Sequence, residues 1–496
     1  MNYYGENPVA IEQAQAVEKP KRKGAVKVLI VVLLILVPLI YGVSAFLIDV
    51  NVKPSASIKE AVLAAENDNN IFHIENTYNE IFDNSANEVE NTDVNNPLFY
   101  YNLLNDRQKI VYRNFLYASK NFDYCIIDKS IYCDDYDKLS KAQQEKVTQE
   151  IFDDSVIAEQ AVYYDYPEIY WVYMSDDTVC EYGDYFYYTL TYVFSEENTG
   201  YNDDEFVSFK ENKQNFDSEL SKIAEELKTQ TSGKTDWEKA LVVYKWVCDN
   251  AEYDYDVADA NGMTDREAVL KGSIYSAVVD KSCVCRGYAE LYKVLLNELG
   301  IECAIVGGQV DQDSIGTDSD NADLLSEIMN LYDDNQNHVW NIVEIDGKYC
   351  NVDVTGGDAD DVNIPYDLSF FCVSDEALRN SHSKSRRFSL PECTDDSNSF
   401  FKHENLYRSS LDGADFDTAI SYAIENDYNF AAIQYEESEQ AVQAQRKYFE
   451  KGNTIQNLLE KYNRKYDDRI NIDDIDYYYS QLDEENAVLY IILNYR

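Results

Sequence analysis

Histidine is scarce in this chain of 496 residues, which contains only His73, His338, His382 and His403. Basic residues are also few, because 42 lysines and arginines face 92 aspartates and glutamates, for a formal net charge of −50. Such a charge repels nucleic acid and anionic membrane surfaces, and it argues against both as partners. The sequence has no glycine-rich phosphate loop and no internal repeat, so it gives no sign of a phosphate-cradling nucleotide site or a repeat architecture.

Long apolar runs are also missing, with one exception at residues 28–48. This run has about the length that spans a bilayer. Basic residues within 1–27 and Asp49 on the other side place the N-terminus in the cytoplasm and the remainder outside. A cleavable signal is the alternative, because residues 43–45 are small, but the long polar lead favours a retained signal anchor.

Cysteine is present but irregularly spaced, which argues against a disulfide scaffold. Disulfides are allowed outside the cell, and the pairs closest in sequence are Cys125–Cys133 and Cys372–Cys393. The ten cysteines are Cys125, Cys133, Cys180, Cys248, Cys283, Cys285, Cys303, Cys350, Cys372 and Cys393.

Residues 281–300 contain the most informative cysteine. Apolar side chains recur at helical spacing in the second half of this stretch, and Gly300 sits where a glycine ends a helix. Cys285 therefore stands at the helix N-terminus or one residue before it. Free N–H groups and the positive dipole end there lower a thiol pKa and can stabilise an oxyanion. The alternative is a small buried hydrophobic residue, the commonest fate of a free cysteine.

Residues 338–354 predict a β-hairpin with Asp346-Gly347 as its two-residue turn. Counting back from that turn, His338 faces Thr355 and lies diagonal to Asp353. Diagonal neighbours are roughly 7–8 Å apart, within reach of their side chains. The carboxylate can then hold the imidazole in one tautomer.

A thiol at the start of a helix and an imidazole oriented by a carboxylate are the parts of a Cys-His-Asp acyl-transfer site. Alternatively, His338 is a core or edge histidine and Asp353 a strand-end cap. The other three histidines lack such a partner pattern. Cys283, Cys285 and His338 are also a conceivable zinc set, but no pair of Cys-x-x-Cys motifs supports it, and we predict no metal and no cofactor.

Four blocks together resemble the bacterial transglutaminase-like domain, whose core is related to papain-like cysteine proteases. They are Cys-Arg-Gly-Tyr-Ala (285–289), Leu-Gly-Ile (299–301), His-Val-Trp-Asn (338–341) and Asn-Val-Asp-Val-Thr (351–355). The resemblance covers roughly residues 235–385 and implies Cys285 as nucleophile, His338 as base and Asp353 as orienting acid. It also implies that Tyr253 and Trp340 support the site, although packing alone explains Tyr253 equally well.

The sequence departs from the family in two places. Gly356-Gly357-Asp358 stands where the family often has Trp-Asp, and residues 311–337 form a long acidic segment before His338. The first departure is expected to alter the rim of the site, and the second to be a solvated insertion. Residues 366–378 and His382 resemble the stretch that closes the family's domain, and His382 is a spare candidate for the site that is not among the predicted catalytic residues.

We predict an α+β fold with a transglutaminase-like core, in which a helix bearing the cysteine packs on an antiparallel sheet, with flanking α/β domains. The predicted order is a cytoplasmic basic tail (1–27), a transmembrane anchor (28–48), an acidic linker (49–94), an α/β domain (95–204), the catalytic domain (205–399) and a small α/β domain (400–496).

The apolar run at 28–48 and its flanking charges predict a membrane-anchored protein with its bulk outside the cell. The block Asp-Tyr-Pro-Glu-Ile-Tyr-Trp (165–171) looks like the region before the transglutaminase-like core in some Gram-positive surface proteins, and the resemblance implies an enzyme of such a cell surface. Release of its acyl group to water makes a peptidase or amidase, and release to an amine makes a transglutaminase. The expected partner is a protein or cell-wall peptide. The alternative is a catalytically silent binding or scaffold protein with the same core. Sugar binding by the Tyr-rich strand predicted at 182–194 is compatible with either.

Overall fold

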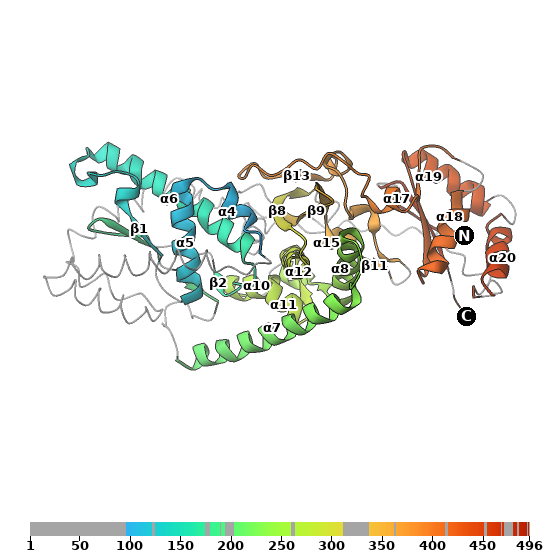
Figure 1. Cartoon of the computed structure of the whole chain (residues 1–496), viewed down its shortest axis with the longest axis horizontal. Coiled ribbons are helices and arrows are strands. Elements are labelled where there is room, and N and C mark those ends of the chain that lie inside the picture. Colours follow the sequence, from blue (N-terminus) through green and yellow to red (C-terminus); the bar gives the residue numbers. More distant parts are fainter. Residues whose placement is uncertain are drawn as a thin grey trace, which may run out of the picture.

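Three sets of helices and strands follow one another along the chain and along the long axis of the molecule (Figure 1). The computed structural model describes residues 96–121, 125–173, 179–188, 190–193, 203–258, 263–310, 337–361, 364–411, 415–450, 454–467, 469–470, 480–483, 486–493 and 495. The predicted membrane span at 28–48 and His73 lie outside these ranges. Within them, no helix is both long and apolar enough to cross a bilayer.

The first set packs helices on a small antiparallel sheet of order β1-β4-β3. Its elements are α4 (Phe99–Leu103), α5 (Asp106–Asn121), β1 (Cys125–Asp128), η3 (Lys129–Ile131), η4 (Tyr136–Lys138), α6 (Lys141–Asp165), β2 (Val172–Tyr173), β3 (Val179–Tyr182), β4 (Tyr185–Tyr188) and β5 (Thr191–Tyr192). The sequence predicts helices at 105–119 and 139–160, with Ser140 as a possible cap, and α5 and α6 confirm them; Ser140 caps α6 with a capping box. The prediction of a single Tyr-rich strand at 182–194 is wrong, because the chain forms β4 and β5 there, in separate sheets.

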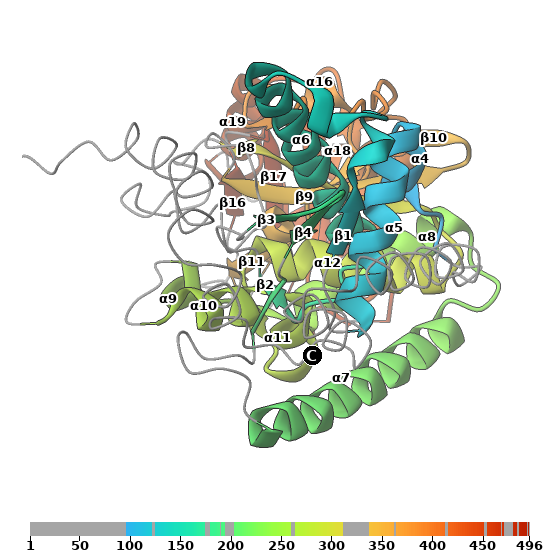
Figure 2. The ribbon, with the colours of Figure 1, turned by 90° about the vertical axis from the view of Figure 1, so that its left-hand side faces the viewer.

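The second set surrounds α12, which packs against an antiparallel sheet of order β10-β9-β8-β13. Its first elements are α7 (Asp203–Gln230), α8 (Asp236–Asn250), β6 (Glu252–Tyr253), α9 (Tyr255–Ala258), α10 (Asp265–Gly272), α11 (Ile274–Val279), β7 (Ser282–Cys283) and α12 (Cys285–Glu298). They are followed by β8 (Cys303–Val310), β9 (His338–Ile345), β10 (Lys348–Val352), α15 (Val354–Gly357), β11 (Asp358–Asp361), β12 (Ile364–Tyr366), η6 (Leu368–Phe370), α16 (Asp375–Leu378) and β13 (His382–Lys384). The long helix α7 lies along the outside of this set (Figure 2). A helix bearing the cysteine on an antiparallel sheet is the predicted core.

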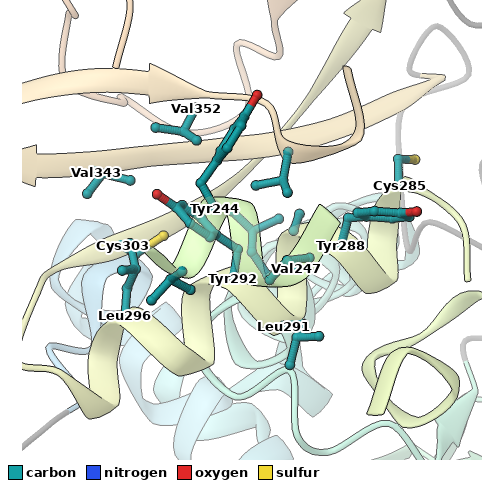
Figure 3. Close-up of a cluster of buried hydrophobic side chains, with 14 of the residues drawn as sticks. Tyr244, Val247, Cys285, Tyr288, Leu291, Tyr292, Leu296, Cys303, Val343 and Val352 are labelled. Atoms are coloured by element: carbon teal, nitrogen blue, oxygen red, sulfur yellow. The ribbon is translucent and has the colours of Figure 1, made fainter. Parts of the chain in front are cut away.

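Side chains alternate across β9. Val339 and Val343 join the large core beneath α12, whereas Trp340 and Ile342 join a smaller core. Strand geometry explains the division, because successive side chains point to opposite faces of a sheet. Figure 3 shows the large core, with Val343 beside side chains of α8 and α12.

Helix α12 ends as its glycine predicts. Gly300 has a φ of +79°, and its N–H donates to the carbonyl of Asn297 at 2.9 Å. The N–H of Ile301 donates to the carbonyl of Leu296 at 3.0 Å. These two bonds form a Schellman motif, which turns the chain back toward β8.

The third set combines helices with a sheet of order β14-β15-β17-β16. Its elements are α17 (Phe400–His403), β14 (Tyr407–Arg408), α18 (Asp415–Glu425), β15 (Phe430–Tyr435), α19 (Ser438–Gln445), η7 (Arg446–Glu450), α20 (Thr454–Lys465), β16 (Ser480–Asp483) and β17 (Val488–Ile492). The sequence predicts a strand at 430–435, which β15 confirms. It also predicts one long helix at 438–462, which is wrong, because η7 is a π-helix between α19 and α20. The sequence places Gly452-Asn453, two poor helix formers, before α20.

The two disulfides considered from sequence spacing do not form, since Cys125, Cys133, Cys372 and Cys393 are not disulfide-bonded. Cys125 lies in the core at the start of β1, whereas Cys133 is only half-buried. Cys372 forms its side-chain hydrogen bond with Cys350 rather than Cys393, and the Cys393 sulfur accepts one from Lys384 at 3.4 Å.

The sequence predicts that residues 165–172 open a strand-rich part, and β2 to β5 follow from Val172. Asp165 itself still ends α6, and its carboxylate accepts hydrogen bonds from the N–H groups of Tyr100 and Tyr101. Pro167 comes two residues later, and a helix usually stops before a proline. The sequence also predicts Asp236 as the cap of α8, but the cap is Thr235, because its side chain accepts from the N–H of Glu238.

Candidate functional site

Cys285 is the first residue of α12, with Val284 as its N-cap. Its place at one end of the helix is visible in Figure 3. The first N–H groups of any helix have no carbonyl one turn earlier to bind, so Cys285 stands at the positive end of the α12 dipole. The residue is 3% exposed, and the sulfur therefore lies in a largely dry environment.

The residues after the cysteine fix the tip of the helix. The Arg286 guanidinium binds the Glu290 carboxylate at 2.7 Å, with both side chains buried. Glu290 also accepts the N–H of Ile274, at the start of α11, at 2.8 Å. A Cβ on Gly287 would stand 2.6 Å from the Cys283 sulfur, so only glycine lets the helix approach β7 this closely.

His338 is the first residue of β9 and is buried. Its Nε2 lies 2.8 Å from Oδ2 of Asp353, and the ring also forms a side-chain hydrogen bond with Cys285. Because Nε2 is used by the carboxylate, Nδ1 is the nitrogen that is left for the thiol. Next to it, Asn337 makes two bonds to the Val310 backbone, at 2.8 and 2.9 Å, and thereby fixes the start of the strand.

The charges of the pair support one another. Burial alone would lower the pKa of His338, but the negative charge of Asp353, together with Cys285, outweighs it and raises that pKa to about 10. Burial would raise the pKa of the Asp353 carboxyl, but His338 and His382 hold it well below its usual range. The site therefore favours an imidazolium next to a carboxylate.

Asp353 follows β10 and acts both as helix cap and as partner of the imidazole, two roles that the sequence presented as alternatives. Its Oδ1 accepts the N–H of Gly356 at 3.1 Å, at the start of α15, while Oδ2 faces His338. The predicted hairpin register is confirmed up to Val352 opposite Asn341. The predicted pairing of His338 with Thr355 does not form, because α15 begins at Val354.

Trp340 lies against the imidazole of His338, with ring centroids 6.1 Å apart and planes 19° from parallel. Its Nε1 donates to Oδ1 of Asn351 at 3.2 Å, which fixes the indole. A Cβ on Gly308 would come within 2.4 Å of the Trp340 ring, so β8 needs glycine beneath it. Trp340 thus supports the imidazole from one side.

Asn341 is a structural link that the sequence reasoning missed, although it belongs to the His-Val-Trp-Asn block. Its Nδ2 donates to the carbonyl of Ala289 on α12 at 3.0 Å and lies 3.4 Å from the carbonyl of Ala304 on β8. The side chain is fully buried. It connects the helix that carries the cysteine to the strand that carries the histidine.

The prediction that His382 lacks a partner is wrong. Its Nε2 lies 3.0 Å from Oδ2 of Asp353, the oxygen that also faces His338. His338, Asp353 and His382 each offer one atom within 4.8 Å of the others, an arrangement that could hold a metal ion. Of the remaining histidines, His403 stacks on Trp237 with ring centroids 3.7 Å apart.

Tyr253 lies on β6, half-buried, with its ring 6.4 Å from that of Tyr288 on α12. This places it near the helix tip, and its supporting role remains a prediction. The structure does not assemble the conceivable zinc set of Cys283, Cys285 and His338. Cys283 is fully buried beneath Gly287, and the described residues that come together as possible ligands are the histidine–aspartate group above.

The first departure from the family motif has a structural reason. A Cβ on Gly357 would stand 1.6 Å from the Tyr244 hydroxyl oxygen, and that hydroxyl donates to the carbonyl of Asp367 at 2.7 Å. Asp358 accepts a hydrogen bond from the Tyr288 hydroxyl. The Gly-Gly-Asp turn therefore lets α8, α12 and α15 meet behind the site. Of the acidic segment, only Asn337 is described.

Comparisons with known proteins agree with this core. Residues 221–354 match the model of the transglutaminase-like superfamily, so this part of the chain is similar to that family. The chain is similar to a crystal structure of a TGase, with 12% identity over 45% of this chain and 50% of that one and a TM-score of 0.23. It is also similar to a candidate cysteine protease from Cytophaga hutchinsonii, with 13% identity over 42% and 65% of the two chains and a TM-score of 0.21.

The chain thus spans half the length of the first of these structures and just under two thirds of the second. No curated protein matches the sequence.

Proposed function

We propose that this protein is a thiol acyl-transfer enzyme acting on peptide or carboxamide groups. One observation carries the proposal: a buried chain of hydrogen bonds joins Cys285, at a helix N-terminus, through His338 to Asp353. These are the nucleophile, the base and the orienting acid of a cysteine acyl-transfer site. The similarity of residues 221–354 to the transglutaminase-like superfamily supports the same reading.

In the proposed reaction the Cys285 thiolate attacks the carbonyl carbon and forms a C–S bond. N–H groups at the start of α12 stabilise the oxyanion that develops. His338 then gives its proton to the leaving nitrogen as the C–N bond breaks, and an amine or ammonia departs. The thioester is cleaved by water in a peptidase or amidase, or by a second amine in a transglutaminase. Asp353 keeps the imidazole oriented in both halves.

The test uses the full chain with a glutamine-containing peptide, with and without a dansylated primary amine. Ammonia release alone indicates hydrolysis, and incorporation of the dansyl group indicates transfer. Cys285→Ala is expected to lower either rate by roughly a thousandfold or more. Cys133→Ala, which removes a half-buried thiol of the first set, is the matched control and should leave the rate unchanged. Equal rates in wild type and Cys285→Ala would refute the proposal.

A catalytically silent binding or scaffold protein is the second candidate, and the 3% exposure of Cys285 favours it. Iodoacetamide separates the two. Fast, selective alkylation of Cys285 at neutral pH that slows in His338→Ala supports the enzyme. Alkylation no faster than that of Cys133 supports the binding protein.

We further propose that residues 28–48 anchor the protein in a bacterial cell membrane, with the described residues outside the cell, where a protein or cell-wall peptide is the substrate. Support comes from the length of the apolar run and from the basic residues before it. The test is membrane fractionation. The protein should resist extraction by alkaline carbonate and dissolve in detergent, and protease added to intact cells should digest it. Release by carbonate would contradict the proposal.

A further inference from the structure

One carboxylate oxygen in the site lies within hydrogen-bond distance of two imidazoles. Oδ2 of Asp353 lies 2.8 Å from Nε2 of His338 and 3.0 Å from Nε2 of His382. All three side chains are at most 3% exposed. The triad described above accounts for the first imidazole and leaves the second without a role.

The sheet brings the two histidines together from distant parts of the chain. In the order β9-β8-β13, His338 pairs with Gly308 and His382 pairs with Val310 of the strand between them. Gly308 and Val310 are two residues apart and so face the same side of β8. The two histidines therefore face the same side, and Asp353 enters from the end of β10.

Hydrogen bonding determines where the protons lie. Oδ1 of Asp353 is taken by the Gly356 N–H, so both imidazoles donate their Nε2–H to Oδ2. The Nδ1 of His382 lies 2.8 Å from the Ser381 hydroxyl, which can donate to it. The carboxylate thus has three donors around it, which is the number that keeps a buried carboxylate ionised.

We propose that His382 is a positioning residue that holds Asp353 ionised and aimed at His338. It acts through its hydrogen bond to the carboxylate. The inference rests on the proposed function, since it assigns His382 to the Cys285–His338 pair. Without its second donor, Asp353 keeps an unfilled acceptor site in a dry environment and takes up a proton more readily.

The Trp340 ring holds the second imidazole as well as the first. Its centroid lies 5.1 Å from that of His382, with the planes at 84°, and 6.1 Å from that of His338. The two imidazoles also contact each other, with ring centroids 5.8 Å apart, so the three rings pack together beside the carboxylate. This arrangement fixes both rings, so that Oδ2 is where their nitrogens converge.

A bound metal is the competing explanation, because the same three residues could ligate one. The two explanations exclude each other. A metal needs the lone pair of each Nε2, whereas the hydrogen bonds need a proton there. Direct contacts of 2.8 and 3.0 Å have the length of hydrogen bonds, and they favour the protonated nitrogens.

The pH dependence of Cys285 alkylation reports on the pair. The titratable groups that face Asp353 from the packed elements are His338, His382, Cys285, Tyr244 and Cys248. Burial raises the pKa of Tyr244 and of Cys248 well above their usual values, so both stay neutral between pH 4 and 9. Neither group therefore contributes to a change in alkylation over that range.

The experiment compares iodoacetamide alkylation of Cys285 from pH 4 to 9 in the full chain and two variants. His382→Phe keeps a ring but loses the donor. It should slow alkylation near pH 6 by roughly tenfold or more, the worth of one hydrogen bond to a charged group, and shift the acid limb up by about one pH unit. His382→Gln puts an amide N–H near the place of Nε2 and should stay within about threefold of wild type.

Three results would overturn the inference. One is a His382→Phe profile that matches wild type. Another is a His382→Gln variant as slow as His382→Phe while both melt like wild type. The third is a wild-type alkylation rate that responds to added EDTA or zinc, together with a His382→Phe rate that does not respond. That result would assign the cluster to a metal.

The experiment distinguishes a failure of the inference from a failure of the variant to fold and from a failure of the proposed function. Should His382→Phe fail to fold, Ser381→Ala replaces it, and a shift of the acid limb in the same direction but smaller is then expected. Alkylation needs no amide substrate. A profile that responds as stated while no amide or amine is turned over leaves the inference standing and sinks the proposed function.

Discussion

Replacing Asp353 by asparagine tests how strongly the site depends on its charge. The pKa of His338 rises from its ordinary 6.5 to about 10 in the folded protein. At about 1.4 kcal/mol per pKa unit, this corresponds to about 5 kcal/mol in favour of the imidazolium. Removing one partner of a buried ion pair typically costs about 3–5 kcal/mol. We therefore expect Asp353→Asn to lose about 3–5 kcal/mol of unfolding free energy where the pair is fully charged.

The loss depends on pH in a direction fixed by the two pKa shifts. The folded pKa of His338 is raised, so its stabilisation is full below 6.5 and disappears as the pH rises through about 10. The folded pKa of Asp353 is lowered, so its stabilisation is present above the ordinary 3.8 and disappears as the pH falls through the folded value. The difference between wild type and variant should be largest from about pH 4 to 6.5 and small above 10.

Urea unfolding followed by tryptophan fluorescence at a series of pH values measures this difference. The net charge of −50 makes the whole protein less stable as the pH rises, so only the difference between two variants is informative. Asp346→Asn in the exposed turn of the same hairpin removes the same charge and is the control. A difference between wild type and Asp353→Asn that stays constant from pH 6 to 10 would refute the charged pair.

Two further substitutions test the frame of the site, each by its melting temperature and urea midpoint. Gly357→Ala puts a methyl group 1.6 Å from the Tyr244 oxygen and should cost about 1–3 kcal/mol or more, whereas Gly356→Ala, 3.1 Å from its nearest atom, should cost clearly less. Equal losses would contradict the close contact. Glu290→Gln leaves Arg286 buried without its charge partner and should cost about 3–5 kcal/mol of unfolding free energy. The double variant Arg286→Met/Glu290→Leu should regain most of that loss. A Glu290→Gln variant as stable as wild type would show that the pair contributes nothing.

The helix and hairpin of the site could be predicted because their signals are local. Gly300 ends α12 by its own positive φ, and Asp346-Gly347 sets the register of β9 and β10 from the turn alone. The approach of His338 to Asp353 follows from that register, and the 2.8 Å contact confirms it. The chemical roles of Cys285 and its partners stay a prediction.

The missed features depend on contacts between distant residues. His382 reaches Asp353 only because β13, a strand of three residues, adds to the far side of β8, and so short a strand has no readable alternation. Gly357 is explained by Tyr244, more than a hundred positions earlier in the chain. The π-helix η7 inside an otherwise regular helical pattern is a third such case.

Asn341 has a consequence for how the site tolerates change. One amide nitrogen reaches carbonyls of both α12 and β8, about one helical turn from the sulfur. Any sliding of α12 over the sheet must break these hydrogen bonds before it separates the Cys285 sulfur from the His338 imidazole. The distance between the sulfur and the imidazole is therefore set by hydrogen bonds to backbone carbonyls. Residues on the surrounding surface can change without altering that distance.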